Sequence, residues 1–168
     1  VPVIKLDQNL FILELFHGPT LAFKDFAARF MARSMAFFME KESKERTILV
    51  ATSRDTGSAV ANGFYQVEGI KIVILYPSGR VSQIQEKQLT TLGENITALE
   101  VEGTFDDCQQ MVRAAFMDED LQSFKQLGSA NSINIARLLP QAVYYLWAWI
   151  QSGKPENTVF SVPSGNFG

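Results

Sequence analysis

The sequence predicts an α/β fold in which helices cover both faces of an open parallel sheet. Short apolar runs rich in β-branched residues, among them 47–52 (TILVAT) and 71–76 (KIVILY), are typical of strands buried in a parallel sheet. Segments with apolar residues at helical spacing separate these runs. Strands that alternate with helices of about ten residues form right-handed βαβ units, which build parallel sheets.

The elements follow one another along the chain. The most regular helical pattern covers 23–41. Gly93 is expected to cap the helix at 82–92, and Thr104 or Asp106 is expected to begin a helix that ends near Met117. The predicted strands are 10–16, 47–52, 71–76, 96–101 and 158–162. The predicted helices are 23–41, 58–67, 82–92, 104–117 and 132–152.

Composition narrows the class of protein. Of the 168 residues, 46% are hydrophobic and 20% are charged, as in an ordinary globular protein. The net charge of −3 argues against nucleic acid as a partner, because phosphate backbones require clustered Lys and Arg. No apolar run approaches the roughly 20 residues that span a bilayer, so no membrane partner is expected. A single cysteine, Cys108, fits a reducing cytoplasm, and with one histidine it leaves no ordinary set of zinc ligands.

Both ends of the chain are unlike those of a natural domain. The chain begins at Val1 without an initiator methionine and ends at Gly168, within a glycine-rich turn. We therefore expect a piece of a longer chain, incomplete at both ends. Ligands of open parallel sheets bind beyond the carboxyl ends of the strands, so the segments after 47–52 and 158–162 are the ones to inspect.

Lys24 lies in HGPTLAFKDF (17–26), between Phe23 and Phe26 at the start of an apolar helix. One interpretation is a surface lysine whose aliphatic stem covers the neighbouring rings. The other is a Schiff-base lysine, whose amine must be partly desolvated to be neutral and nucleophilic. This segment by itself favours the surface lysine.

Two other segments suit an anion. Residues 53–58 (SRDTGS) open a helix whose free N–H groups fit a carboxylate or phosphate, unless Asp55 or Thr56 only caps that helix. Residues 163–168 (PSGNFG) contain glycines that let the backbone approach an anion, although an ordinary turn has the same composition. A GxxxxGK[ST] motif is absent, which argues against P-loop nucleotide hydrolysis.

The segment 131–137 (NSINIAR) begins the last predicted helix. Asn131 or Ser132 is expected to cap it, and Arg137 lies more than a turn further on. An arginine beside helix N-terminal N–H groups forms a phosphate clamp. A solvated or ion-paired arginine is the alternative.

Five segments, in this order and spacing, resemble threonine synthases of the bacterial and fungal type. These are fold-type II pyridoxal-phosphate (PLP) enzymes, with a fold like that of tryptophan synthase β. The segments are HGPTLAFKDF, ATSRDTGSAV, VILYPSGRVSQIQEKQLTTLG, NSINIARLLPQAVYY and SVPSGNFG. The resemblance implies a PLP-dependent lyase that converts O-phospho-L-homoserine and water into L-threonine and phosphate, the last step of threonine biosynthesis.

The resemblance also implies roles for individual residues. Lys24 would carry PLP and remove the substrate Cα proton, and Asp55 would lie near the cofactor 3′-hydroxyl, where related enzymes have Asn. The implied loop for the cofactor phosphate is Ser164, Gly165, Asn166, Phe167 and Gly168. The implied substrate-binding residues are Ser53, Thr56 and Ser58 in the carboxylate loop, and Asn131, Ser132 and Arg137 around the substrate phosphate.

Three domain segments are implied as well. Residues 1–46 would belong to a large domain, 47–152 would form a small α/β domain with three or four parallel strands, and 153–168 would begin the return to the large domain. Two residues depart from the family pattern. Arg54 replaces the glycine of SGDTG, which puts carboxylate recognition in question, and Pro140 stands inside a helix, where proline costs about 3 kcal/mol or causes a kink.

Two alternatives remain open at this point. One is another fold-type II activity, a serine/threonine dehydratase or a cysteine synthase, whose substrates lack a γ-phosphate. A phosphate clamp at Arg137 separates threonine synthase from these enzymes. The other is a related protein that binds PLP or a phosphorylated ligand without turnover, which Arg54 motivates.

Overall fold

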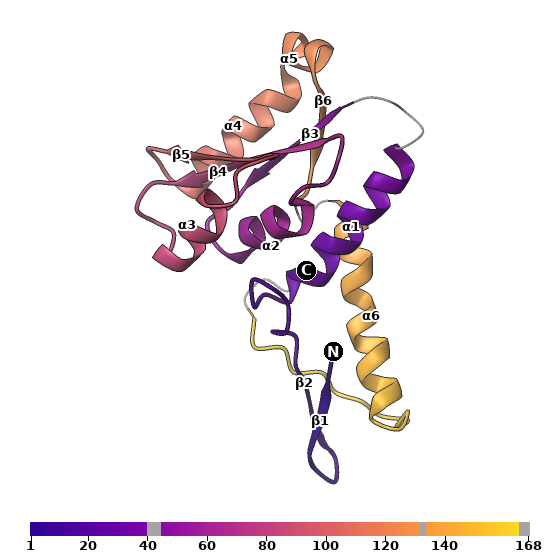
Figure 1. The fold of residues 1–168 in the computed structure, drawn as a ribbon. Coiled ribbons are helices and arrows are strands. Elements are labelled where there is room, and N and C mark those ends of the chain that lie inside the picture. The colour runs from indigo at the N-terminus through magenta and orange to yellow at the C-terminus, as the bar shows by residue number, and fades with distance from the viewer. Residues whose placement is uncertain (40–44, 132–133, 165–168) are drawn as a thin grey trace.

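A computed structural model describes residues 1–39, 45–131 and 134–164. At its centre is a four-stranded sheet in the order β5-β4-β3-β6, and all of its pairings are parallel (Figure 1). The strands are β3 (Arg46–Ala51), β4 (Ile70–Pro77), β5 (Ile96–Val101) and β6 (Gln126–Ser129). The predicted open parallel sheet is confirmed.

Helices cover both faces of this sheet, as predicted. On one face lie α1 (Lys24–Met39), α2 (Asp55–Phe64) and α3 (Gln83–Thr90), and on the other lies α4 (Phe105–Met117), which is followed by α5 (Glu119–Phe124). Successive side chains of a strand point to opposite faces. Ile48 of β3 therefore packs in the core with Phe64 of α2, whereas its neighbour Leu49 packs with Val112 of α4.

Hydrogen bonds between residues close in sequence set the starts of α2 and α4. The Thr104 side chain accepts a hydrogen bond from the Asp107 N–H, and the Asp107 carboxylate accepts one from the Thr104 N–H, so Thr104 rather than Asp106 begins α4. Helix α3 ends at Thr90 with Thr91 as its C-cap, so Gly93, whose φ of 65° costs glycine little, is not the cap residue that the sequence predicted. The start of α2 at Asp55 precedes the predicted 58, since the Thr52 hydroxyl accepts the Gly57 N–H at 3.0 Å.

Helix α6 (Ile135–Gln151) packs beside α1 (Figure 1). The Asn134 side chain caps it by accepting the Ala136 N–H at 3.0 Å. The prediction that Asn131 or Ser132 caps this helix is therefore wrong. Pro140 lies inside α6 without ending it.

The predicted strand at 10–16 is shorter and belongs to a separate hairpin. Strands β1 (Val3–Asp7) and β2 (Leu10–Leu13) pair antiparallel, apart from the main sheet. The strand predicted at 158–162 is not formed. The described residues offer it no neighbouring strand to bond with, and Val159 in this segment is 95% exposed. Within the described part of the chain, no helix combines the length and the apolar character needed to cross a bilayer.

Candidate functional site

The starts of two helices meet at the carboxyl end of β3. Lys24 is the first residue of α1 and Asp55 is the first residue of α2. The Lys24 Nζ donates to both carboxylate oxygens of Asp55, at 3.0 Å and 3.1 Å. The fold thus joins HGPTLAFKDF to SRDTGS through one ion pair.

Lys24 is only 6% exposed. Its Nζ lies 4.9 Å from the centre of the Phe23 ring, so apolar surface covers part of the amine. The interpretation of Lys24 as a surface lysine is therefore wrong. Lys24 is thus a buried amine paired with the Asp55 carboxylate.

The loop before α2 is held by Thr52. Its hydroxyl accepts the Gly57 N–H and donates to the Arg54 carbonyl at 2.9 Å. A Cβ on Gly57 would lie 2.4 Å from the Thr52 Cγ2, so this position has no room for a side chain. The N-cap residue Arg54 makes no side-chain capping bond, and the Asp55 carboxylate is bonded to Lys24. The alternative in which Asp55 or Thr56 only caps this helix is wrong.

The predicted carboxylate-binding residues lie on this loop. Ser53 and Thr56 are half-buried, and Ser58 is 1% exposed. The Ser58 Oγ has no hydrogen-bond partner among the residues that the structure describes. The N–H groups of Asp55 and Thr56 belong to the first turn of α2, where a helix has no acceptor of its own.

Arg54 is exposed, with a φ of −149° and a ψ of −152°. This is extended backbone that any residue adopts. The concern that Arg54 replaces a glycine with a positive φ, or crowds the loop, is therefore not supported by the geometry.

Arg137 is 2% exposed, which contradicts the solvated-surface interpretation. Its Nη1 donates to the Ala130 carbonyl at 2.9 Å. The Nε of Arg137 and the Oδ1 of Asn131 are buried without a partner among the described residues. Desolvation lowers the pKa of Arg137, and the negative charge of Asp55 acts in the opposite direction. Arg137 therefore lies within electrostatic reach of the Lys24–Asp55 pair.

The structure describes only part of the predicted site segments 131–137 and 163–168. Ser164 is exposed, and its N–H donates to the Val162 carbonyl at 2.8 Å. The other predicted site residues of these segments lie outside the described residues, namely Ser132, Gly165, Asn166, Phe167 and Gly168. The proposed loop for the cofactor phosphate stays a prediction.

The sequence reasoning missed two buried polar residues of α6. The Gln141 Nε2 donates to the Arg137 carbonyl at 2.8 Å, and the Tyr144 hydroxyl donates to the Phe23 carbonyl at 2.5 Å. Arg137, Gln141 and Tyr144 follow i, i+4, i+7 spacing, and so share one face of the helix. This spacing is the sequence signal that could have identified Gln141 and Tyr144.

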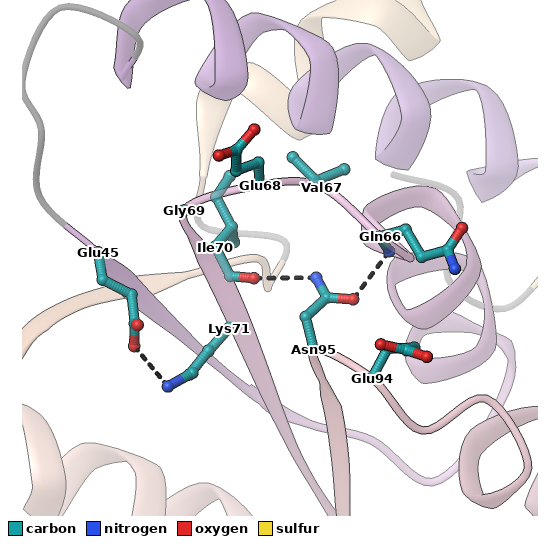
Figure 2. Close-up of a pocket in the computed structure, with 9 residues that line it drawn as sticks. All are labelled: Glu45, Gln66, Val67, Glu68, Gly69, Ile70, Lys71, Glu94 and Asn95. Carbon is teal, nitrogen blue, oxygen red and sulfur yellow. Dashed lines mark hydrogen bonds and ion pairs between the residues drawn. The ribbon is translucent and has the colours of Figure 1, made fainter.

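A hollow of about 410 Å³ lies at the opposite edge of the sheet, near the amino ends of β3, β4 and β5 (Figure 2). Glu45 pairs with Lys71 at 2.9 Å. Asn95 donates to the Ile70 carbonyl and accepts the Gln66 N–H. These polar groups already bond one another, so this hollow is not the candidate site.

The donor set at the carboxyl edge fits PLP and a polar substrate. A buried primary amine, Lys24, is available for an aldehyde. A buried polar atom without a partner costs about 1–3 kcal/mol, so such an atom can accept or donate to a polar ligand. Ser58, Asn131 and Arg137 each have one such atom among the described residues. The fold and the site together define a PLP enzyme of the open parallel-sheet class.

Comparisons with known proteins support this class of enzyme. The chain belongs to the pyridoxal-phosphate dependent enzyme family, which it matches over residues 2–168. Threonine synthases of Haemophilus influenzae and Escherichia coli are 53% and 52% identical to it, over 99% of this chain and 39% of each relative. The PLP-bound threonine synthase of Brucella melitensis superposes with a TM-score of 0.89 at 46% identity, over 99% of this chain and 36% of that chain. The chain thus spans 39% of the length of these two curated relatives.

Proposed function

We propose that the full-length protein is a threonine synthase, which converts O-phospho-L-homoserine and water into L-threonine and phosphate. The observation that carries this proposal is the buried Lys24 amine, bonded to Asp55 at the carboxyl end of β3, with the buried Arg137 within electrostatic reach. The similarity to threonine synthases along 99% of the chain supports it.

Three parts of the chain would hold the cofactor. Lys24 would carry it covalently, Asp55 would lie near its 3′-hydroxyl, and the loop from Ser164 to Gly168 would bind its phosphate. When bound, PLP supplies an electron sink for the negative charge that develops at the substrate Cα.

Lys24 moves the proton. Its Nζ takes the proton from the substrate Cα, and burial beside Phe23 keeps water from competing for it. Asp55 binds the Nζ with both carboxylate oxygens, so it holds the amine in place when the amine is free and protonated.

Two groups of residues bind the two ends of the substrate, its carboxylate and its phosphate. Ser53, Thr56 and Ser58, with the free N–H groups of α2, hold the substrate carboxylate. The phosphate is held by Asn131, Ser132 and the guanidinium of Arg137, which also stabilises the phosphate as it leaves. The substrates of a dehydratase or a cysteine synthase lack a γ-phosphate that such a buried cation would bind. The buried state of Arg137 therefore favours threonine synthase.

The test uses the purified full-length protein with O-phospho-L-homoserine, and with serine and O-acetylserine for comparison. We expect threonine and phosphate in equal amounts from O-phospho-L-homoserine. Lys24→Ala should lose both the visible absorbance of the bound cofactor and threonine formation, while Lys5→Ala, at an exposed position in β1, should keep both. Pyruvate from serine as the main product would indicate a dehydratase. Cofactor absorbance without turnover of any substrate would indicate a binding protein.

The compartment and the domain division belong to the same proposal. Cys108 is buried and free, which suits the reducing cytoplasm. Residues 1–46 and 153–168 are assigned to a large domain and 47–152 to a small one.

A further inference from the structure

Helix α6 turns a polar face inward. Its buried residues are Arg137, Gln141 and Tyr144, whereas apolar residues such as Leu146 are 54% exposed. Burial of polar groups lowers stability unless they are bonded. Of these three residues, Tyr144 contacts the start of α1.

Tyr144 contacts the chain on both sides of Lys24. Its hydroxyl donates to the carbonyl of Phe23, the residue before Lys24, at 2.5 Å and across 121 positions of sequence. Its ring meets the ring of Phe26 edge-on, with centroids 5.8 Å apart and an interplanar angle of 80°. Tyr144 is itself 6% exposed, so water competes little for the hydroxyl.

The surroundings of the Tyr144 hydroxyl keep it protonated, so that it can donate a hydrogen bond. Burial raises the pKa of Tyr144, and the negative charge of Asp25 raises it further. The Asp25 carboxylate in turn accepts the Thr20 N–H at 2.9 Å. The start of α1 is thus held by Thr20 through Asp25, and by Tyr144 through Phe23.

We propose that Tyr144 is a positioning residue for Lys24. Its hydroxyl fixes the carbonyl at the start of α1, and so directs the Lys24 amine toward Asp55 and the cofactor. This inference rests on the role of Lys24 in the proposed function, but it does not depend on which substrate the enzyme uses.

The test is Tyr144→Phe in the full-length protein, which removes the hydroxyl and keeps the ring. The main readout is the rate constant for PLP attachment to the cofactor-free protein, followed by visible absorbance. We expect attachment about tenfold slower, the effect of one lost hydrogen bond, and a similar fall in kcat with KM within about twofold. Tyr145→Phe is the matched control, because Tyr145 packs edge-on against Phe160, and it should attach PLP at the wild-type rate.

A second variant separates the hydroxyl from the packing. Phe26→Leu removes the ring contact and keeps the hydrogen bond, so it should lower Tm while PLP attachment stays within about twofold. The proposal is overturned if Tyr144→Phe lowers Tm without slowing attachment, or if Phe26→Leu slows attachment as much. Attachment of PLP without threonine formation by the wild type would reject the proposed substrate alone. Unchanged attachment in Lys24→Ala would reject the proposed function, and this inference with it.

Discussion

Replacing Arg137 by Ala tests the proposed site for the substrate phosphate. The side chain is 2% exposed, and its Nε has no partner among the described residues, so a phosphate bound there would meet a largely desolvated cation. Loss of a hydrogen bond between charged groups in such surroundings costs about 3 kcal/mol, or on the order of a hundredfold in kcat/KM. Arg137→Lys keeps the charge but loses the paired geometry of the guanidinium, and should fall between Ala and wild type.

The same substitution has a structural cost that must be measured separately. Arg137→Ala removes the donor to the Ala130 carbonyl and empties buried volume, so we expect a loss of about 1–3 kcal/mol in the free energy of unfolding. Kinetics are therefore measured well below the unfolding temperature and with saturating PLP. The visible absorbance of the bound cofactor should stay near normal, since its phosphate is assigned to the loop that begins at Ser164. Arg113→Ala, on an exposed position of α4, is the control and should leave kcat/KM unchanged.

Two results would refute this reasoning. An unchanged kcat/KM in Arg137→Ala would leave Arg137 with only its structural bond to Ala130. Loss of PLP with substrate affinity retained would place Arg137 on the cofactor instead of the substrate.

Three further predictions concern the surrounding loops. Gly57→Ala should destabilise the protein by about 1–3 kcal/mol in thermal unfolding, because its Cβ would meet the Thr52 Cγ2 at 2.4 Å; an unchanged Tm would show that Thr52 moves freely. Arg54→Gly should leave KM for O-phospho-L-homoserine unchanged, since Arg54 is exposed and extended, and a large fall in KM would mean that its side chain crowds the substrate. Asn134→Ala should lower the free energy of unfolding by about 1 kcal/mol, because it removes the cap of α6, whereas Asn131→Ala should mainly raise KM. The opposite pattern would make Asn131 the structural residue and Asn134 the substrate-binding one.

The elements predicted correctly are those whose signals are local. The run TILVAT forms β3, because a continuous β-branched segment suits a strand buried on both faces. Thr104 and Ser82 begin their helices, since a cap depends on side chains within three residues. Lys24 was a candidate from its apolar flanks, although those flanks also fitted a surface lysine.

The strand that the sequence analysis missed, and the one it predicted without a partner, depend on partners far away in sequence. Strand β6 has half-buried residues and a glycine, and it exists because its backbone pairs with β3, about 80 positions earlier. The apolar segment 158–162 has a better strand composition, but the described residues leave its backbone without a neighbouring edge. Composition alone does not show which backbone is available for pairing.

The sequence by itself determined the alternation of strands β3, β4 and β5 with helices, the likeness to threonine synthases, and the residue types available for chemistry. Only the tertiary structure decided that Lys24 is buried, that its amine bonds Asp55, and that α6 turns Arg137 and Tyr144 inward. The physical reason is that helical spacing defines which side chains share a face, but not which face is buried. On α6, the Tyr144 hydroxyl bonds to the Phe23 carbonyl across 121 positions, a contact that helical spacing does not reveal.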